Sequence, residues 1–325
     1  NSGKEESPFS SIQLAIDFSS SGDTVMIEPG MYTEKIDFNG KHIVVCSRFE
    51  VTGDSSYIEE TIIDGNQGGS VVTFQNGENS TAVLAGLTLQ NGLALDGGGV
   101  YSNGADPTLK SLRIGACTAE ENGGGIYCAG STVTMDDVTI MDCSASESGG
   151  GIYLSNTETE ITNSTIQGNV SDHGGGMFIH NSSMVTLESV LVNNNSVDQA
   201  GGGVLLSGGS SLTGTGLSIV AGEADRGAGI WCEDNSVLEM SRTIFTGNTA
   251  VSYGGGVYGD NSTLNIRNCV IVENSAPYGS AIVMNYDGSM ILTNSILWDN
   301  NNDPISLQSS PSSSTSSSSI FVKPL

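Results

Sequence analysis

The chain has 325 residues, 44 of them glycine, and 36 acidic residues outnumber 10 lysines and arginines to give a formal charge of −26. So few cations, scattered along the whole length, cannot build the basic face that nucleic acid or an anionic membrane surface requires, which argues against both as partners. No apolar run approaches the roughly 18 residues of a membrane-spanning helix, which argues against membrane insertion.

The acidic, lysine-poor composition, rich in Asn, Ser and Thr, is typical of an exported protein, so we expect an extracellular or cell-surface location. The chain starts at Asn1 without the charged and apolar pattern of a signal peptide, which favours a mature or trimmed product.

The N-terminal segment, residues 1–20, predicts a capping helix. Within "SSIQLAIDFSS", residues 10–20, Ile12, Ala15 and Ile16 have helical spacing with Phe9, and serines stand at both ends. A short amphipathic helix of this kind suits the open end of a solenoid. Alternating segments punctuated by Pro-Gly and Asn-Gly follow it and predict strands.

A repeated phrase dominates the middle of the chain. Three glycines followed by an aliphatic and an aromatic residue appear in "NGGGIYCA" at Asn122 and "SGGGIYLS" at Ser148, with related phrases from Asp96 to Tyr278. The third position of the triplet occurs eight times between 99 and 281, an average period of 26 residues. A period of this length with alternating β-branched residues predicts a β-solenoid and excludes helical repeats.

Each repeat contains three short alternating segments, such as "GIYLS" at Gly151, "TETEIT" at Thr157 and "NSTIQGN" at Asn163, followed by a polar turn. We therefore expect an all-β fold, a right-handed parallel β-helix with three strands per coil, over residues 21–305. Strand parity points Ile152 and Leu154 inward. One predicted core column, on the second strand, contains Met135, Ile161, Leu187, Met240, Ile266 and Leu292.

A second column is rich in asparagine and predicts amides that bond between coils at a turn. Its members are Asn91, Cys117, Cys143, Asn169, Asn195, Ala221, Asn248, Asn274 and Asn300. Cys117 and Cys143 are neighbours in it, which leaves open either a disulfide or two buried thiols.

The last segment, residues 306–325, contains "SSPSSSTSSSS" and predicts a low-complexity tail or linker.

The segment "SIQLAID" and the later "GDTVMIEPGMYTEKIDFNGKHIVV" together resemble the N-terminal part of pectin-lyase-like right-handed β-helix proteins of secreted bacterial type. The Gly-Gly-Gly-Ile-Tyr repeats, with "FTGN" at Phe245 to Asn248, are similar to the repeats of chlamydial polymorphic outer-membrane proteins. The resemblance covers about residues 9–300 and implies the fold. It does not select an activity, because the superfamily includes lyases, hydrolases and adhesins.

An aromatic column follows the first inward aliphatic residue and points outward by parity. It contains Tyr101, Tyr127, Tyr153, Phe178, Leu205, Trp231, Tyr258 and Val283. The rings either brace one another along the rod or form a flat platform for sugar rings or a neighbouring protein. A platform requires Tyr127, Tyr153, Phe178 and Trp231 to be partly exposed.

An acidic column lies two residues before the glycines. It contains Glu121, Glu147, Asp172, Gln199 and Asp225. Stacked carboxylates repel unless a cation or hydrogen bonds intervene, so Glu121, Glu147, Asp172 and Asp225 either bind Ca²⁺ or face water. No other cofactor is expected.

The next column places His173 and Arg226 two coils apart, with Asp172 and Asp225 beside them. In an enzyme, these four would be the candidate catalytic residues of a polysaccharide lyase or glycoside hydrolase. The paired-Asp and Arg-x-Lys signatures of polygalacturonases are absent, however. Our leading hypothesis is a non-catalytic surface or matrix protein that binds polysaccharide or a partner protein; the alternatives are such an enzyme and a self-assembling filament or surface-layer subunit.

Overall fold

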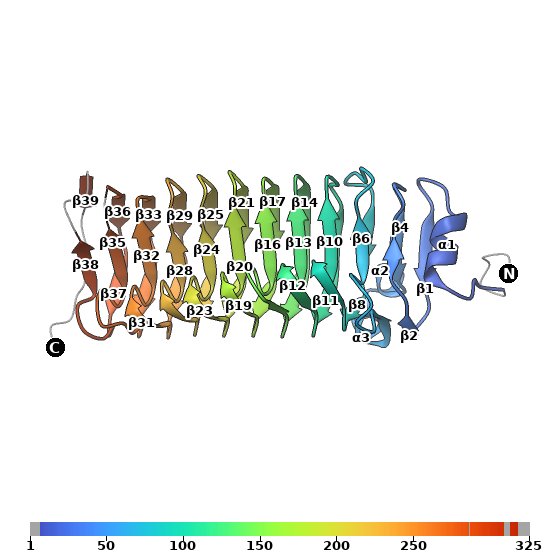
Figure 1. Ribbon diagram of the computed structural model, residues 1–325, viewed down its shortest axis with the longest axis horizontal. Helices are drawn as coiled ribbons and strands as arrows, with labels where there is room; N and C mark the ends of the chain where they lie inside the picture. Colours follow the sequence, from blue (N-terminus) through green and yellow to red (C-terminus); the bar gives the residue numbers. More distant parts are fainter. Residues whose placement is uncertain (1–6, 286, 309–312, 318–325) are drawn as a thin grey trace.

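Strands pair in parallel with the strands one repeat later, in register. Ile126 lies beside Ile152 and Tyr127 beside Tyr153. The computed structural model describes residues 7–285, 287–308 and 313–317. Repeated pairing stacks the coils into one rod, with the first and last described strands at opposite ends (Figure 1). The predicted parallel β-helix is confirmed. No helix in these described ranges is both long and apolar enough to cross a bilayer.

The first sheet has 11 strands and holds the segment after each glycine triplet. Its strands are β3 (Ile36–Asp37), β6 (Val72–Phe74), β10 (Val100–Asn103), β13 (Ile126–Ala129), β16 (Ile152–Ser155), β20 (Met177–His180), β24 (Val204–Leu206), β28 (Ile230–Cys232), β32 (Val257–Asp260), β35 (Ile282–Asn285) and β38 (Ile305–Gln308).

The second sheet has 21 strands and contains two segments of each coil, because β11 and β14 run through the corner between them. The leading segments are β1 (Thr24–Ile27), β4 (Val44–Ser47), β7 (Val83–Ala85), β11 (Thr108–Gly115), β14 (Thr132–Met141), β17 (Glu158–Thr162), β21 (Met184–Glu188), β25 (Ser211–Thr215), β29 (Val237–Ser241), β33 (Thr263–Arg267), β36 (Ser289–Thr293) and β39 (Ser313–Ser317). The trailing segments are β2 (Gly30–Thr33), β5 (Thr61–Asp64), β8 (Thr88–Gln90), β18 (Thr165–Gln167), β22 (Leu191–Asn193), β26 (Ser218–Val220), β30 (Ile244–Thr246), β34 (Val270–Val272) and β37 (Ile296–Trp298).

The third sheet is a correction to the expected three strands per coil, because the polar segment before the glycines is a strand and not a turn. Its seven strands are β9 (Leu93–Asp96), β12 (Thr118–Asn122), β15 (Ser144–Ala145), β19 (Val170–His173), β23 (Ser196–Ala200), β27 (Glu223–Arg226) and β31 (Thr249–Tyr253). Small inward residues, among them Val197, Ala224 and Ala250, form a separate apolar cluster beneath it. Polar outward residues hide this short alternation in the sequence.

The predicted capping helix is confirmed as α1 (Ile12–Phe18), which covers the N-terminal end of the rod (Figure 1). The Ser11 side chain accepts a hydrogen bond from the Leu14 amide. Two charged side chains of the first coil hold the helix ends. The Glu34 carboxylate accepts from the Ile12 amide at 3.0 Å, and the Lys41 ammonium donates to the Ile16 carbonyl at 2.6 Å. Both charges complement the helix dipole.

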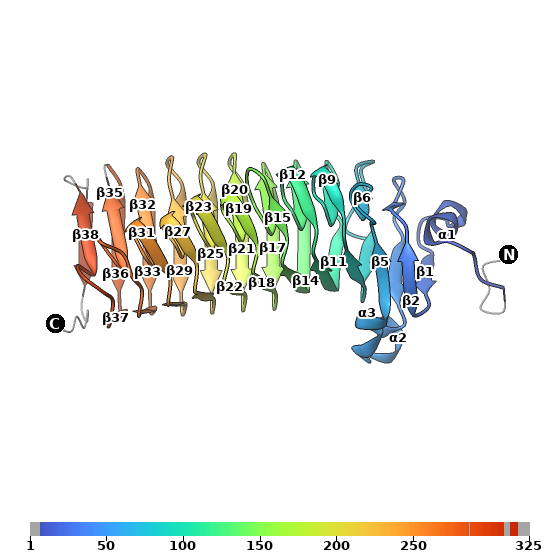
Figure 2. The same ribbon diagram turned by 60° about the horizontal axis from the view of Figure 1, so that its bottom comes forward.

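Two further helices were not expected from the sequence. They are α2 (Phe49–Thr52) and α3 (Ser56–Glu60), which project from the rod between β4 and β5 (Figure 2). Ion pairs of 3.1 Å from Lys110 to Glu50 and 3.0 Å from Arg113 to Glu59 tie them to β11. Both helices are too short to show helical periodicity in the sequence.

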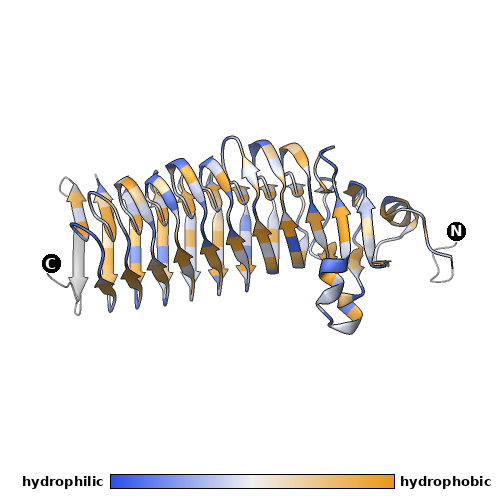
Figure 3. Ribbon diagram, turned by 90° about the horizontal axis from the view of Figure 1, so that it is seen from below, coloured by the Kyte–Doolittle hydropathy of each residue, from blue (hydrophilic) through white to orange (hydrophobic). Residues whose placement is uncertain are grey.

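One continuous apolar core runs inside the rod, and hydrophobic positions recur coil after coil (Figure 3). The predicted column on the leading segment is buried in every member. One coil contributes no side chain to this column, because Gly214 occupies the position between Leu187 and Met240. The Met240 sulfur fills the resulting gap, because a Cβ on Gly214 would lie 2.5 Å from it.

The solenoid extends past the expected boundary at residue 305. Strand β38 continues to Gln308, and β39 pairs with β36, so these parts of the expected 306–325 tail form strands. The rest of that segment lies outside the described residues.

The predicted asparagine ladder is confirmed. Asn169, Asn195, Asn248 and Asn274 are fully buried. The Asn248 side-chain amide donates to Asn274 Oδ1 at 2.8 Å and to the Ile219 carbonyl at 3.1 Å. The Asn169 amide donates to Asn195 Oδ1 at 3.0 Å in the same way.

Two predicted members of the ladder were wrong by one residue. Asn91 and Ala221 have φ of 55° and 50° and belong to the left-handed corner just before the ladder. Register places Gly92 and Gly222 in the ladder itself. The coils differ in length by a residue or so. Counting with a fixed period therefore assigns the wrong residue to the ladder in these two coils. The ladder is therefore interrupted at Gly222.

The six cysteines are free and buried, including the neighbours Cys117 and Cys143, so the buried-thiol alternative holds in this structure. Burial raises the pKa of Cys128 and of Cys232 to about 12, which keeps these thiols protonated and unreactive.

The glycine triplet forms the corner between the third and first sheets, and a side chain is excluded at each of its three positions for a different reason. Gly123 has φ of 67°, and a Cβ there would lie 2.5 Å from the Ile126 carbonyl. A Cβ on Gly124 would meet the Ser144 carbonyl of the next coil at 2.3 Å. One on Gly125 would meet the Ile140 side chain at 2.6 Å, inside the core. Coils can stack at this corner because the side chains are absent.

Replacing the first glycine of a triplet should destabilise the rod by more than backbone strain alone. Gly149 has φ of 68°, and a Cβ would lie 2.5 Å from the Ile152 carbonyl. We expect Gly149→Ala to combine about 1–2 kcal/mol of left-handed strain with about 1–3 kcal/mol of overpacking. Gly104→Ala is the control, because its φ is 64° and nothing lies within 4 Å. Urea unfolding that gives equal losses for both variants would contradict this account.

Removing one ladder amide should cost about 3 kcal/mol. Asn248 accepts from the Gly222 amide at 2.9 Å and donates to two acceptors, all of them buried. Asn248→Ala removes all three of these bonds, at about 1 kcal/mol or more per lost bond. Asn193→Ala, on the outward side of β22, should change the unfolding midpoint little. Similar midpoints for the two variants would count against a stabilising ladder.

Candidate ligand-binding face

The predicted aromatic column and the column before the glycines lie on either side of the glycine corner. A Cβ on Gly201 would lie 2.7 Å from Leu205 Cβ, so the first glycine sits beside the aromatic column. Ala200 and Tyr253, from the column before the glycines, pack against Leu205, Trp231 and Tyr258. We call these two columns, with the glycine corner between them, the corner face.

Four rings form a stack along the N-terminal part of the corner face. Ring centroids are 5.3 Å apart for Tyr101 and Tyr127, 5.2 Å for Tyr127 and Tyr153, and 5.5 Å for Tyr153 and Phe178. The planes differ by 3°, 0° and 16°. All four residues are half-buried. Inside the stack each ring covers its neighbour, so the rings offer mainly their edges and hydroxyl groups to solvent.

The stack is broken at Leu205, and the rings beyond it are covered. Trp231 and Tyr258 stack at 4.2 Å with exposed fractions of 5% and 4%. The expectation that Trp231 is partly exposed was therefore wrong. Tyr253 contacts Tyr258 edge-on at 6.4 Å, and the Arg226 guanidinium lies 6.0 Å from the Trp231 ring centre. Parity correctly points these residues outward from the first sheet, but side chains of the third sheet bury them.

Polar groups flank the exposed part of the ring stack. On one side Asp96 Oδ1 accepts from both the amide and the side chain of Asn122 at 3.1 Å. On the other, Asn103 donates to the Tyr101 hydroxyl at 3.1 Å. Burial, with the Asp96 charge, raises the pKa of Tyr127 to about 12, so its hydroxyl remains a neutral donor and acceptor. This strip can hydrogen-bond a polar ligand along several coils.

The acidic column follows the edge of the corner face without converging. Glu147 and Asp172 are exposed, whereas Glu121 and Asp225 are half-buried. Asp225 accepts from Arg226 at 3.1 Å and from Ser252 at 2.5 Å. Within the described ranges, no three His, Cys, Asp or Glu side chains are grouped to hold a metal ion. The geometry adds no support for Ca²⁺ binding by these carboxylates.

The candidate catalytic residues are not brought together. His173 pairs with Ala200, which pairs with Arg226, so the two lie two coils apart, about 10 Å. Arg226 is turned to its own neighbour Asp225 and to Trp231. His173 and Asp172 lie on β19, and no hydrogen bond joins their side chains in the described structure.

Two carboxyls with raised pKa were missed by the sequence analysis. They are Glu233 and Asp260. Burial is the main cause of each raised pKa, and repulsion from the Asp234 carboxylate raises both further. They lie two residues beyond Trp231 and Tyr258, so extending the aromatic column along its strands would have found them. They are the strongest acid–base candidates near the corner face.

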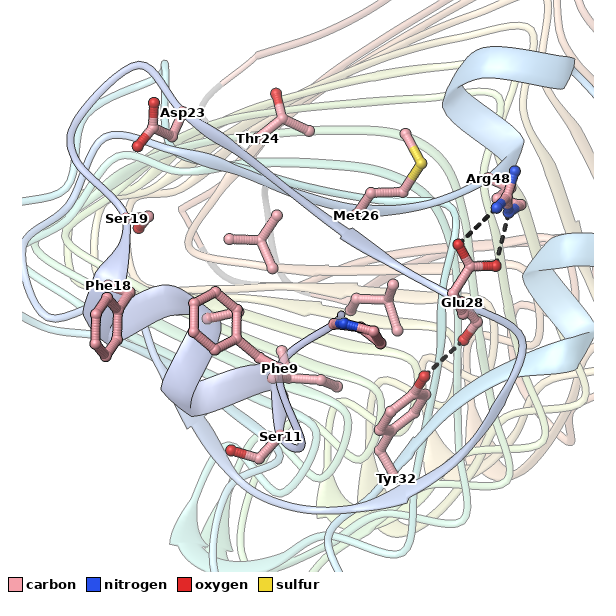
Figure 4. Close-up of a pocket in the computed structure, with 15 residues that line it drawn as sticks. Phe9, Ser11, Phe18, Ser19, Asp23, Thr24, Met26, Glu28, Tyr32 and Arg48 are labelled. Carbon is pink, nitrogen blue, oxygen red and sulfur yellow. Dashed lines mark hydrogen bonds and ion pairs between the residues drawn. The ribbon is translucent and has the colours of Figure 1, made fainter. Parts of the chain in front are cut away.

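A hollow of about 610 Å³ lies far from these residues, between α1 and β1. Figure 4 shows it with Phe9 and Phe18 on the helix side and the Arg48–Glu28 ion pair, 2.7 Å long, on the other. A second, of about 310 Å³, lies near Asp106 and Glu158. Neither includes His173, Arg226 or Glu233.

Solved structures similar to this chain include carbohydrate-active enzymes. A pectin methylesterase from Aspergillus niger has 12% identity and a TM-score of 0.35, over 97% of this chain and 86% of its own. A family PL6 polysaccharide lyase from Pseudopedobacter saltans also has 12% identity and a TM-score of 0.35, over 96% and 91%.

A curated relative is the Escherichia coli strain K12 protein named "Probable autotransporter YfaL". It is 32% identical over 88 residues, which are 25% of this chain and 7% of that protein. The chain therefore spans less than a tenth of this relative's length. Residues 47–219, more than half of the chain, match the family described as "Right handed beta helix region". The stacked coils and this match together place the chain in the right-handed β-helix family.

Proposed function

We propose that the chain is an exported, non-catalytic β-helix rod that binds a neutral polysaccharide along the ring stack of the corner face. The name of its Escherichia coli relative supports a surface location. The formal charge of −26 supports a neutral ligand, because an anionic polymer would be repelled.

The spacing of the stack carries the proposal. Successive rings from Tyr101 to Phe178 lie 5.2–5.5 Å apart, close to the length of one sugar unit in an extended chain. A polysaccharide parallel to the rod can thus repeat one set of contacts in each coil. Because the ring faces cover one another, the contacts are hydrogen bonds to hydroxyls and packing on ring edges, with Asp96 and Asn122 alongside. Several weak contacts in register then add up.

The separation of His173 and Arg226 supports a non-catalytic role, because general acid–base chemistry needs both groups within reach of one bond. A neutral-glycan panel incubated with the chain should yield no new reducing or unsaturated ends. Turnover that is lost in His173→Ala, Arg226→Ala or Glu233→Gln would favour the enzyme alternative.

Removing two hydroxyls should weaken binding without weakening the fold. Tyr127→Phe with Tyr153→Phe keeps the ring stack but deletes two hydrogen-bonding groups, each worth about 0.5–1.5 kcal/mol. We expect affinity for a retained neutral glycan to fall about 5- to 100-fold, measured by affinity electrophoresis or calorimetry. The unfolding midpoint should hardly change. Unchanged glycan affinity would contradict the proposed site, and retention on a protein partner alone would replace the ligand class.

Replacing the buried ring of Trp231 should have the opposite effect, a loss of stability without a loss of glycan affinity. Trp231 is 5% exposed and stacks on Tyr258, so Trp231→Ala should cost about 3–5 kcal/mol of stability. Glycan affinity, measured at a temperature where the variant remains folded, should stay within about twofold. A stable variant that loses its glycan would move the binding site to the C-terminal half of the corner face.

A further inference from the structure

An apolar patch occupies the outward side of the trailing segments near the C-terminal end of the rod. Ile244, Val270 and Ile296 lie directly beside one another on β30, β34 and β37. Ile244 is 43% exposed and Ile296 45%. Val272 and Trp298 form the next outward column, and Trp298 is 45% exposed. Figure 2 shows β37 along the lower edge of the rod, towards the C-terminal end.

Nearer the N-terminus the column that contains Ile244 is mostly polar, and only Leu191 interrupts the polar residues between Arg113 and Ser218. In the register of β14 and β18, Thr139 and Thr165 stand where Ile244 and Ile296 stand later. The apolar stretch is thus confined to a few coils and is not a property of the fold. Exposed apolar residues grouped in this way mark an interaction surface. We call it the C-terminal patch.

Unpaired cations border the C-terminal patch on one side. Arg242 and Arg267 are exposed, and they stand at the corner where the chain enters the trailing segments. The described residues contain eight lysine and arginine side chains. Six of them bind a carboxylate or a backbone carbonyl: Lys35, Lys41, Arg48, Lys110, Arg113 and Arg226. Arg242 and Arg267 do neither within the described part of the chain.

Carboxylates border the opposite side. Glu273 and Asp299 have φ of 56° and 51° and occupy the corner where the chain leaves the trailing segments. Both are exposed. The C-terminal patch therefore has a positive edge, an apolar centre and a negative edge, in that order across the strands.

We infer that the C-terminal patch is the contact between two parallel copies of this chain. A two-fold axis parallel to the rod turns the positive edge of one copy onto the negative edge of the other and joins the apolar centres. An antiparallel pair would place arginine over arginine and carboxylate over carboxylate. The centre covers three strands of three residues each, roughly 10 Å by 14 Å, on the order of 150 Å². A standard interface buries about 800 Å² per partner, so the contact is weak and favours copies held side by side.

Sedimentation velocity of the 325-residue chain at low salt tests the contact. The weight-average sedimentation coefficient should rise between about 10 µM and about 1 mM. Ile244→Thr with Ile296→Thr keeps β-branched residues on the strands and should shift this rise at least about tenfold in concentration. Val170→Thr with Val251→Thr, exposed on the third sheet, is the control and should leave it unchanged. A wild-type chain that stays monomeric throughout overturns the proposal.

Charge exchange tests the pairing of the edges. Arg242→Glu with Arg267→Glu makes both edges acidic, and Glu273→Arg with Asp299→Arg makes both basic, so each variant alone should remain monomeric. Mixed together, they should form a heterodimer. A mixture no larger than its separate components overturns the pairing, provided that circular dichroism shows folded variants.

A nitroxide on Ser20→Cys tests the orientation, because the native cysteines are buried. Parallel copies bring the two labels near each other, whereas antiparallel copies separate them by twice the distance from the C-terminal patch to the cap. A pulsed electron paramagnetic resonance signal from the long distance alone overturns the parallel arrangement.

Discussion

Parallel pairing in register, one coil apart, is the constraint on which the whole molecule depends. It places each side chain directly beside its equivalent in the next repeat, so a residue type persists in a column only if it tolerates contact with its own kind. Asparagine does so because its amide both donates and accepts, as between Asn248 and Asn274. Tyrosine does so by ring stacking, as between Tyr127 and Tyr153. Carboxylates repel, and Gln199 interrupts their column.

Periodicity in the sequence predicts much of this fold, because columns are visible without knowledge of the path of the chain. The inward residues Ile152 and Leu154 and the asparagine ladder follow from spacing and parity alone. The errors arise where the period varies. A one-residue change in coil length moved Gly222 into the position assigned to Ala221. The helices α2 and α3 belong to a single coil, so no repetition could reveal them.

The candidate site was less predictable because burial outside the core depends on a neighbouring sheet. Tyr153 and Trp231 have the same parity, but one is half-buried and the other is covered. The difference comes from the neighbouring side chains of the third sheet, because Arg226 and Tyr253 lie against Trp231 and Tyr258. A single-strand pattern contains no information about that neighbour. The same limit hid the raised pKa of Glu233, whose main cause is burial.

Three stacking systems are interrupted in the same coil. Leu205 breaks the ring stack, Gly214 breaks a core column, and Gly222 breaks the amide ladder. Backbone pairing continues through this coil, but the coil lacks the ring-on-ring and amide-to-amide contacts that join the coils on either side of it. The rod thus consists of two firmly bonded stacks joined at a seam. Under tension along its axis, this seam is where the molecule should part first, with each half keeping its own stack and ladder.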